Sequence, residues 1–197
     1  MERVSRISPD TASEEVGAIY EEIRRVSKGW VPDLYQVLAH RPPLLEGFWK
    51  IQRSLILKGK IDPQRREMVN AFVSLKNRCE YCAHHHLAFG LRAGLTREKL
   101  DALESYAESP LFSDVEKLLL RYADEYLSQG GASPEVVEAL KKHWSEEQVV
   151  ELEVILGSIN LANHFITSMD IEIEKERISS PELEQLRKRM SRSRGTP

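Results

Sequence analysis

Helical periodicity runs through almost the whole chain, and this pattern limits the possible folds more than any other feature. Apolar residues recur three or four positions apart, as at Val16, Ile19 and Ile23, and no run of four residues alternates like an exposed strand. The periodic segments are bounded by residues that stop or cap helices, such as Gly29 and Asp62. The sequence therefore predicts an all-α protein.

The same pattern predicts the domain organisation. We expect one helical domain over residues 1–178, with an N-terminal helical extension over about 1–40 and two motif helices over about 62–93. Residues 179–197 carry basic side chains among serines and are expected to form a flexible tail. Helices are expected over residues 13–28, 33–39, 42–57, 62–76, 79–93, 114–128 and 146–169, with shorter ones starting at Thr96 and Ser133.

Charge and hydropathy narrow the classes of partner. Basic residues number 28 and acidic residues 31, so no overall field favours nucleic acid or an anionic membrane. No stretch approaches the roughly 18 consecutive apolar residues of a membrane span, and the first residues lack the apolar core of a signal peptide. Apolar residues on nearly all sides of segments 44–57 and 146–169 indicate burial against a second subunit. We expect a cytoplasmic homo-oligomer without nucleic-acid or membrane partners.

Both cysteines and three of the six histidines lie in the segment RCEYCAHHHLAFG, residues 78–90. Attachment of a c-type haem requires a histidine directly after the second cysteine, where this chain has Ala83, so haem is excluded. A closed zinc site needs ligands beyond this segment, and the chain has no other cysteine. Zinc held by Cys79, Cys82, His86 and a carboxylate is a minority alternative, and we expect neither a metal nor an added cofactor.

Helical geometry brings both cysteines and a histidine onto one face. Cys79 and Cys82 are three positions apart, Cys82 and His86 are four apart, and His85 reaches Cys82 from three positions away. A helix N-terminus and a nearby imidazole both favour the thiolate form of a cysteine. Glu67, in the preceding helix, is either a buried partner of this face or a surface acid beside basic neighbours.

The spacing of Glu67, Cys79, Cys82 and His86, with eleven, two and three residues between them, resembles a known signature. It is that of the alkylhydroperoxidase D-like proteins of the carboxymuconolactone decarboxylase superfamily. The segments around the motif also resemble the peroxidase-related members, so the resemblance covers roughly residues 30–172. It implies a multi-helix orthogonal bundle that assembles into dimers, trimers or hexamers.

By the same resemblance, the protein reduces organic hydroperoxides with electrons from a thiol or dithiol reductant. Cys82 is then the thiolate that attacks the peroxide, and Cys79 resolves the resulting sulfenic acid to a Cys79–Cys82 disulfide. Glu67 and His86 form the proton relay. The redox-active disulfide takes the place of a cofactor.

One position departs from the best-known hydroperoxidase of the family, which has a histidine between the two cysteines. This chain has Tyr81 there, and a phenol that titrates near about 10 donates or relays a hydrogen bond but is no base at neutral pH. His85, Asn160 and His164 are further candidates for the relay or the pocket, because Asn160 and His164 interrupt an otherwise apolar helix.

Three alternative functions are compatible with parts of this pattern. A non-redox decarboxylase-like enzyme of the same superfamily would use a pocket arginine or histidine, such as Arg121 or His164, and the cysteine pair argues against it. A dithiol redox sensor would form the same disulfide without turnover. A zinc-binding oligomer would hold metal at the thiols.

Overall fold

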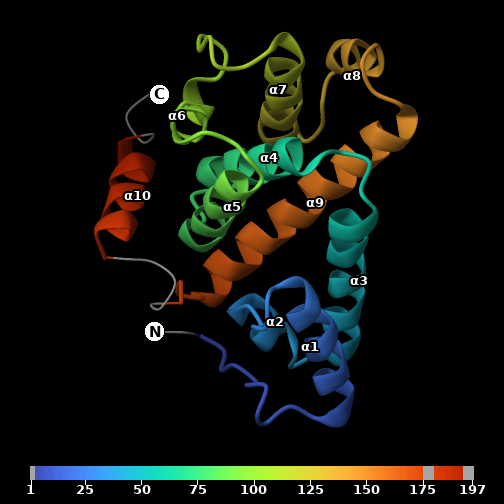
Figure 1. Cartoon of the computed structure of the whole chain (residues 1–197), viewed down its shortest axis with the longest axis vertical. Coiled ribbons are helices and arrows are strands. Elements are labelled where there is room, and N and C mark those ends of the chain that lie inside the picture. Colours follow the sequence, from blue (N-terminus) through green and yellow to red (C-terminus); the bar gives the residue numbers. More distant parts are fainter. Residues whose placement is uncertain (1–2, 175–179, 193–197) are drawn as a thin grey trace.

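A computed structural model describes residues 3–174 and 180–192, and every regular element within these ranges is a helix (Figure 1). The all-α prediction is confirmed. The elements are α1 (Glu14–Val26), α2 (Asp33–Leu38), α3 (Pro42–Lys58), α4 (Pro63–Lys76), α5 (Glu80–Arg92), α6 (Arg97–Asp101), the 3₁₀ helix η1 (Leu103–Ser105), α7 (Asp114–Gln129), α8 (Pro134–Lys141), α9 (Glu146–Met169) and α10 (Ser180–Arg192).

Helix ends coincide with the expected capping residues. The Asp62 carboxylate accepts a 3.0 Å hydrogen bond from the Arg65 backbone N–H and so starts α4. Ser113 and Ser145 start α7 and α9 with capping boxes, and Gly130 ends α7 in the left-handed conformation that glycine adopts readily. Local capping chemistry therefore determines where these helices begin and end.

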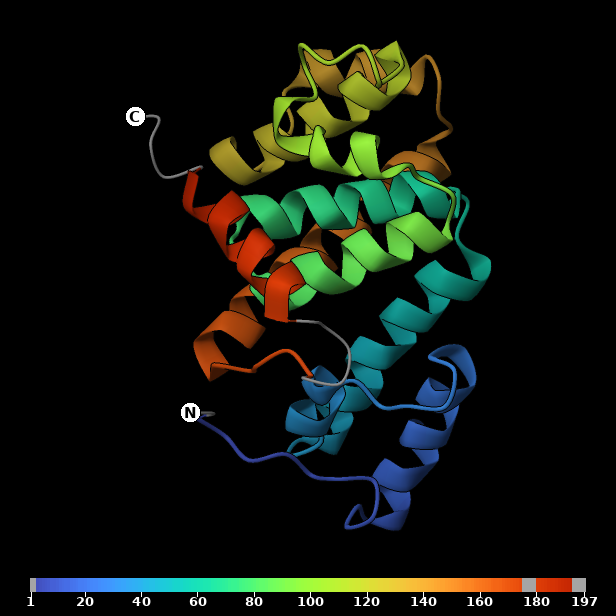
Figure 2. The ribbon, with the colours of Figure 1, turned by 60° about the vertical axis from the view of Figure 1, so that its left-hand side comes forward.

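A hairpin of α4 and α5 lies at the centre of the molecule, and α9 runs beside it (Figure 1). Helices α1, α2 and α3 lie toward one end, and α6, α7 and α8 toward the other, as the second view also shows (Figure 2). The core includes Met68 and Phe72 of α4 and Leu152 and Leu156 of α9, which are almost completely buried. Burial of this apolar surface holds the hairpin in place.

Helix α9 is long and apolar enough to cross a membrane by length and composition, and it is the only such helix in the described part of the chain. The core helix of a globular protein passes the same test. Leu152, Ile155, Leu156 and Ile159 are buried within this fold, so packing against α4 already accounts for much of the apolar character of α9.

Residues 180–192 differ from the flexible tail that the sequence predicts, because they form α10 beside α5 (Figure 2). Leu186 and Met190 lie four positions apart and are buried, and the Arg187 guanidinium pairs with the Glu80 carboxylate at 2.9 Å. This short apolar stripe lies among basic residues, and its burial accounts for the helix. The rest of the predicted tail lies outside the described residues.

Candidate functional site

The turn between α4 and α5 holds the two cysteines. Arg78 has a left-handed backbone with φ of 56°, and the following Cys79 N–H donates a 3.0 Å hydrogen bond to the Ser74 carbonyl. Cys79 is the N-cap of α5, and its Sγ accepts a 3.4 Å hydrogen bond from the Cys82 backbone N–H. Both thiols are free and buried. The helix N-terminus predicted at Cys79 is therefore confirmed.

The ionisation of the two thiols is linked. The hydrogen bond from the Cys82 side chain holds the pKa of the Cys79 thiol below its ordinary value, against the opposing effect of burial. Burial raises the pKa of the Cys82 thiol well above its ordinary value, and the hydrogen bond and charge of Cys79 raise it further. When the reduced dithiol loses one proton, its negative charge thus lies on Cys79.

Glu67 reaches this region from α4 as a buried partner of a histidine. Its side chain is 8% exposed, its Oε2 lies 2.8 Å from His86 Nδ1, and Arg66 Nε donates to its Oε1 at 3.1 Å. Burial raises the pKa of the Glu67 carboxyl, but the bonds and charges of His86 and Arg66 outweigh it and hold the pKa below its ordinary value. Of the two readings of Glu67, the structure supports the buried one.

Helix α9 adds an amide to the dithiol. Asn163 is 1% exposed, and its side chain accepts a 3.0 Å bond from Asn77, donates a 3.2 Å bond to Ser74 Oγ and hydrogen-bonds Cys82. Asn160 accepts a 2.8 Å bond from the same Asn77 amide. This buried network ties α9 to the turn that holds the cysteines.

A second carboxylate, Glu174, follows α9 and accepts three hydrogen bonds. Tyr81 Oη donates to its Oε1 at 2.7 Å, His85 Nε2 lies 3.0 Å from its Oε2, and the Asp33 backbone N–H donates to Oε1 at 3.3 Å. Burial raises the pKa of Glu174, but the bonds and charge of His85 and the Tyr81 bond lower it to about 2. Burial and Glu174 also raise the pKa of the Tyr81 phenol, so Tyr81 serves here as a hydrogen-bond donor.

A cavity of about 150 Å³ borders Cys82. Glu67, Tyr81, His85 and His86 also line it, whereas Cys79 does not. Most of its remaining wall is apolar or aromatic and comes from α2, α3, α5 and α9. These residues include Trp30, Leu34, Tyr35, Phe48, Leu55, Phe89, Ile155, Ile159 and Ile166. The site therefore suits a small apolar molecule placed against a thiol and a few polar groups.

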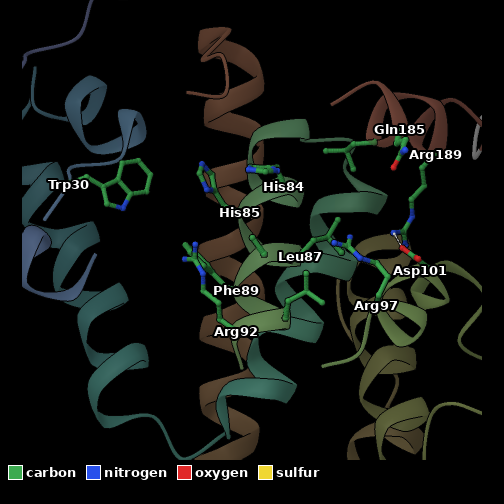
Figure 3. Close-up of a pocket in the computed structure, with 13 residues that line it drawn as sticks. Trp30, His84, His85, Leu87, Phe89, Arg92, Arg97, Asp101, Gln185 and Arg189 are labelled. Atoms are coloured by element: carbon green, nitrogen blue, oxygen red, sulfur yellow. Dashed lines mark ion pairs between the residues drawn. The ribbon is translucent and has the colours of Figure 1, made fainter. Parts of the chain in front are cut away.

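A larger cavity of about 550 Å³ lies on the outer side of α5, bordered by α6 and α10 (Figure 3). Trp30 and His85 lie toward one end of it, and Arg97 and Arg189 toward the other. Trp30, His85 and Phe89 line both cavities. His85 therefore borders both the small cavity at Cys82 and this larger one.

Two of the α9 residues that the sequence suggests for the relay or the pocket lie elsewhere. His164 is exposed and lines neither cavity, and Asn160 bonds to Asn77 rather than lining the pocket. Two other polar residues of α9 contact the dithiol, because the Asn163 side chain hydrogen-bonds Cys82 and the Thr167 side chain hydrogen-bonds Cys79. Sequence reasoning also missed Glu174, which no local motif marks.

Among the described residues, no group of three or more histidine, cysteine, aspartate or glutamate side chains could hold a metal ion. The carboxylates of Glu67 and Glu174 are each engaged with a histidine, because Glu67 bonds His86 and Glu174 bonds His85.

Comparison with known sequences points to one family. The model of the Carboxymuconolactone decarboxylase family matches residues 42–125. The uncharacterised protein YnjA of Escherichia coli (strain K12) is 32% identical over 119 residues, which cover 58% of this chain and 63% of YnjA. The uncharacterised protein YdfG of Bacillus subtilis (strain 168) is 25% identical over 114 residues, 57% of this chain and 78% of YdfG. The match thus spans less than two thirds of the length of YnjA.

Solved structures share the fold at low sequence identity. The debrominase Bmp8 in its apo form superposes with a TM-score of 0.78 at 18% identity, over 93% of this chain and 97% of that one. A peroxidase-related protein with an alkylhydroperoxidase AhpD core, from Ralstonia eutropha JMP134, gives 0.77 at 21% identity, over 89% and 93%. Residues 42–125 thus resemble the carboxymuconolactone decarboxylase family, and the solved structures show that the chain shares its fold with Bmp8 and with a protein that has an alkylhydroperoxidase AhpD core.

Proposed function

We propose that the protein is a thiol-dependent peroxidase that reduces organic hydroperoxides through Cys79 and Cys82. The observation that carries the proposal is the composition of the small cavity, where Cys82 borders an apolar space together with the paired Glu67 and His86. Cys79 lies one helical turn before Cys82 and hydrogen-bonds to it, within reach for a disulfide after modest adjustment. These parts supply a nucleophile, a resolving thiol and a proton acceptor.

The reaction consumes two thiols. The Cys82 thiolate attacks the terminal oxygen of the hydroperoxide, an S–O bond forms, the O–O bond breaks, and the leaving alkoxide takes a proton to become an alcohol. The Cys79 thiolate then attacks Cys82 Sγ, an S–S bond forms, and the oxygen departs with a proton as water. A thiol or dithiol reductant restores both thiols by disulfide exchange.

Access to the cavity and the pKa of the thiols favour different sulfurs for the attack on the hydroperoxide. The Cys79 thiol has the lowered pKa, but of the two sulfurs only that of Cys82 borders the cavity. A thiolate cannot attack a substrate that it does not reach, whereas a proton passes readily between hydrogen-bonded groups. We therefore assign the attack to Cys82, after its proton has moved to Cys79 or to the His86–Glu67 pair.

Assembly and location are part of the same proposal. Large apolar side chains stay exposed on α3 and α9, and a second copy of the chain would cover them: Leu44, Ile51, Ile56, Leu57, Val150, Val154 and Leu161. Light scattering after gel filtration tests this, since a monomer in the parent would refute the homo-oligomer. A cytoplasmic location stays a prediction.

The first experiment measures intact mass and free thiols of the reduced, metal-analysed protein before and after one equivalent of cumene hydroperoxide. We expect the parent to lose two thiols to a disulfide, and Cys79→Ser to keep a sulfenic acid on Cys82 that dimedone traps. Cys82→Ser is the matched control and should gain no dimedone adduct. An unchanged number of free thiols in the parent, or one zinc ion bound per chain, would refute the proposal.

Turnover distinguishes the peroxidase from its nearest rival, the redox sensor. A sensor forms the disulfide once, whereas a peroxidase consumes hydroperoxide continuously when dithiothreitol is supplied as reductant. Consumption limited to one equivalent per chain would favour the sensor.

Reductive dehalogenation is a second candidate, because the small cavity has an aromatic wall next to a dithiol. The fold is shared with the debrominase Bmp8, of which one structure contains 2,3,4-tribromopyrrole. In that case a thiol would remove the halogen, the ring would gain a proton, and the second thiol would release the halide as the disulfide forms. Bromide release from this bromopyrrole, compared with hydroperoxide consumption, decides between the two.

A further inference from the structure

Two histidines that follow one another in α5 each bind a different carboxylate. His86 Nδ1 lies 2.8 Å from Glu67 of α4, and His85 Nε2 lies 3.0 Å from Glu174, which follows α9. Successive residues of a helix point about 100° apart around its axis, so the two imidazoles approach from different directions. Both nevertheless line the cavity that Cys82 borders. The site thus contains two carboxylate–histidine pairs rather than one.

The second pair is held firmly. Glu174 also accepts hydrogen bonds from Tyr81 Oη at 2.7 Å and from the Asp33 backbone N–H at 3.3 Å. The His85 ring lies 4.6 Å from the Tyr81 ring and 6.0 Å from that of Phe89, measured between centroids. Residues of α5, of α2 and of the segment after α9 therefore fix the orientation of this imidazole, and an oriented group is what proton transfer requires.

Peroxide reduction needs two proton movements in different directions. A base must take the proton of the attacking thiol, and an acid must give a proton to the alkoxide that leaves when the O–O bond breaks. The His86–Glu67 pair lies one turn along α5 from Cys82 and suits the first task. It leaves the second task without an assigned residue.

We propose that His85 is the general acid that protonates the leaving alkoxide, with Glu174 and Tyr81 as its positioning residues; this inference rests on the proposed peroxidase function. The bond of Nε2 to Glu174 leaves Nδ1 as the donor. The alkoxide takes the Nδ1 proton and becomes an alcohol, and His85 becomes a neutral imidazole. Because His85 also lines the larger cavity, it recovers its proton from that side (Figure 3).

The charges around His85 agree with this role. Glu174 stays ionised at neutral pH because its pKa is about 2, and its negative charge balances the positive charge of a protonated His85. The other groups nearby are Tyr81 and His84 on α5 and Asp33 on α2, which pairs with Arg6.

The test compares oxidants that differ in how much their leaving group needs a proton. An alkoxide from cumene hydroperoxide is a strong base, whereas the acetate released by peracetic acid departs without a proton. We would follow sulfenic acid formation in single turnovers of the reduced parent, His85→Gln and the matched control His86→Gln. Glu174→Gln is a second variant for the case that His85→Gln does not fold.

We expect His85→Gln to slow the reaction with cumene hydroperoxide by about 100-fold and to affect peracetic acid far less. His86→Gln should slow both oxidants alike, because thiol deprotonation precedes either reaction. Glu174→Gln should show the selectivity of His85→Gln in weaker form. Equal slowing of both oxidants in His85→Gln, or slowing of neither, would overturn the assignment. A parent inert toward both oxidants would instead refute the peroxidase function itself.

Discussion

Replacing Glu174 with glutamine measures what the Tyr81–Glu174–His85 cluster contributes to stability. The carboxylate is 9% exposed, and although burial raises its pKa, the bonds from His85 and Tyr81 lower that pKa from 4.5 to about 2. At about 1.36 kcal/mol per pKa unit, folding stability gains up to about 3 kcal/mol from the ionised group. Because the folded pKa is depressed, this gain is complete above pH 4.5 and is lost as pH falls through about 2.

Urea denaturation of the parent and Glu174→Gln between pH 7 and pH 3 tests the magnitude and the sign. At pH 7 the variant should lose up to about 3 kcal/mol, which lowers the melting temperature of a chain of this size by about 6–12 °C. The difference should shrink as the pH approaches 3. Glu172→Gln, in the exposed part of the same segment, is the matched control. A difference that stays constant with pH, or that is below about 1 kcal/mol at pH 7, would refute the reasoning.

Four further substitutions have expected outcomes. Glu67→Gln should slow thiol oxidation by hydroperoxide by about 100-fold in stopped-flow measurements, since His86 loses its charged partner. Tyr81→Phe removes a donor to Glu174 and should lower the free energy of unfolding by about 1 kcal/mol in urea titrations. Gly59→Ala should destabilise by about 1–3 kcal/mol, because its Cβ would overlap a carbonyl oxygen of the preceding helical turn. Gly47→Ala, with open space in α3, should stabilise by about 0.5–1 kcal/mol, and the same sign of melting-temperature shift in both alanine variants would contradict this contrast.

Most helix boundaries could be predicted from the sequence because short-range chemistry determines them. The capping box at Ser145 fixes the start of α9 at Glu146. The N-cap Asp62, followed directly by Pro63, fixes the start of α4. Helix α10 was not predicted, because only the docking of Leu186 and Met190 makes a basic segment helical. That docking depends on residues about 100 positions earlier in the chain, beyond the reach of any local pattern.

Some residues of the candidate site could likewise be predicted from local spacing, whereas others come together only in the folded chain. Cys79, Cys82 and His86 lie within one helix, so their proximity follows from helical spacing. The sequence alone does not decide whether Glu67 is buried, because a glutamate beside arginines is common on protein surfaces. The packing of α4 against α5 buries it. Glu174 lies 93 positions from Tyr81, and its role depends on how the end of α9 passes α5.

Burial of the dithiol imposes an order on the proposed chemistry. The cavity reaches Cys82, whose thiol pKa is raised, whereas Cys79, whose thiol pKa is lowered, does not line the cavity. Attack by Cys82 therefore requires its proton to leave first. If His86 accepts that proton, Cys79 gains none and resolves the sulfenic acid without a further deprotonation. If Cys79 accepts it, resolution must wait for a second deprotonation. Slower disulfide formation at lower pH, with sulfenic acid accumulating in the parent, would identify the second route.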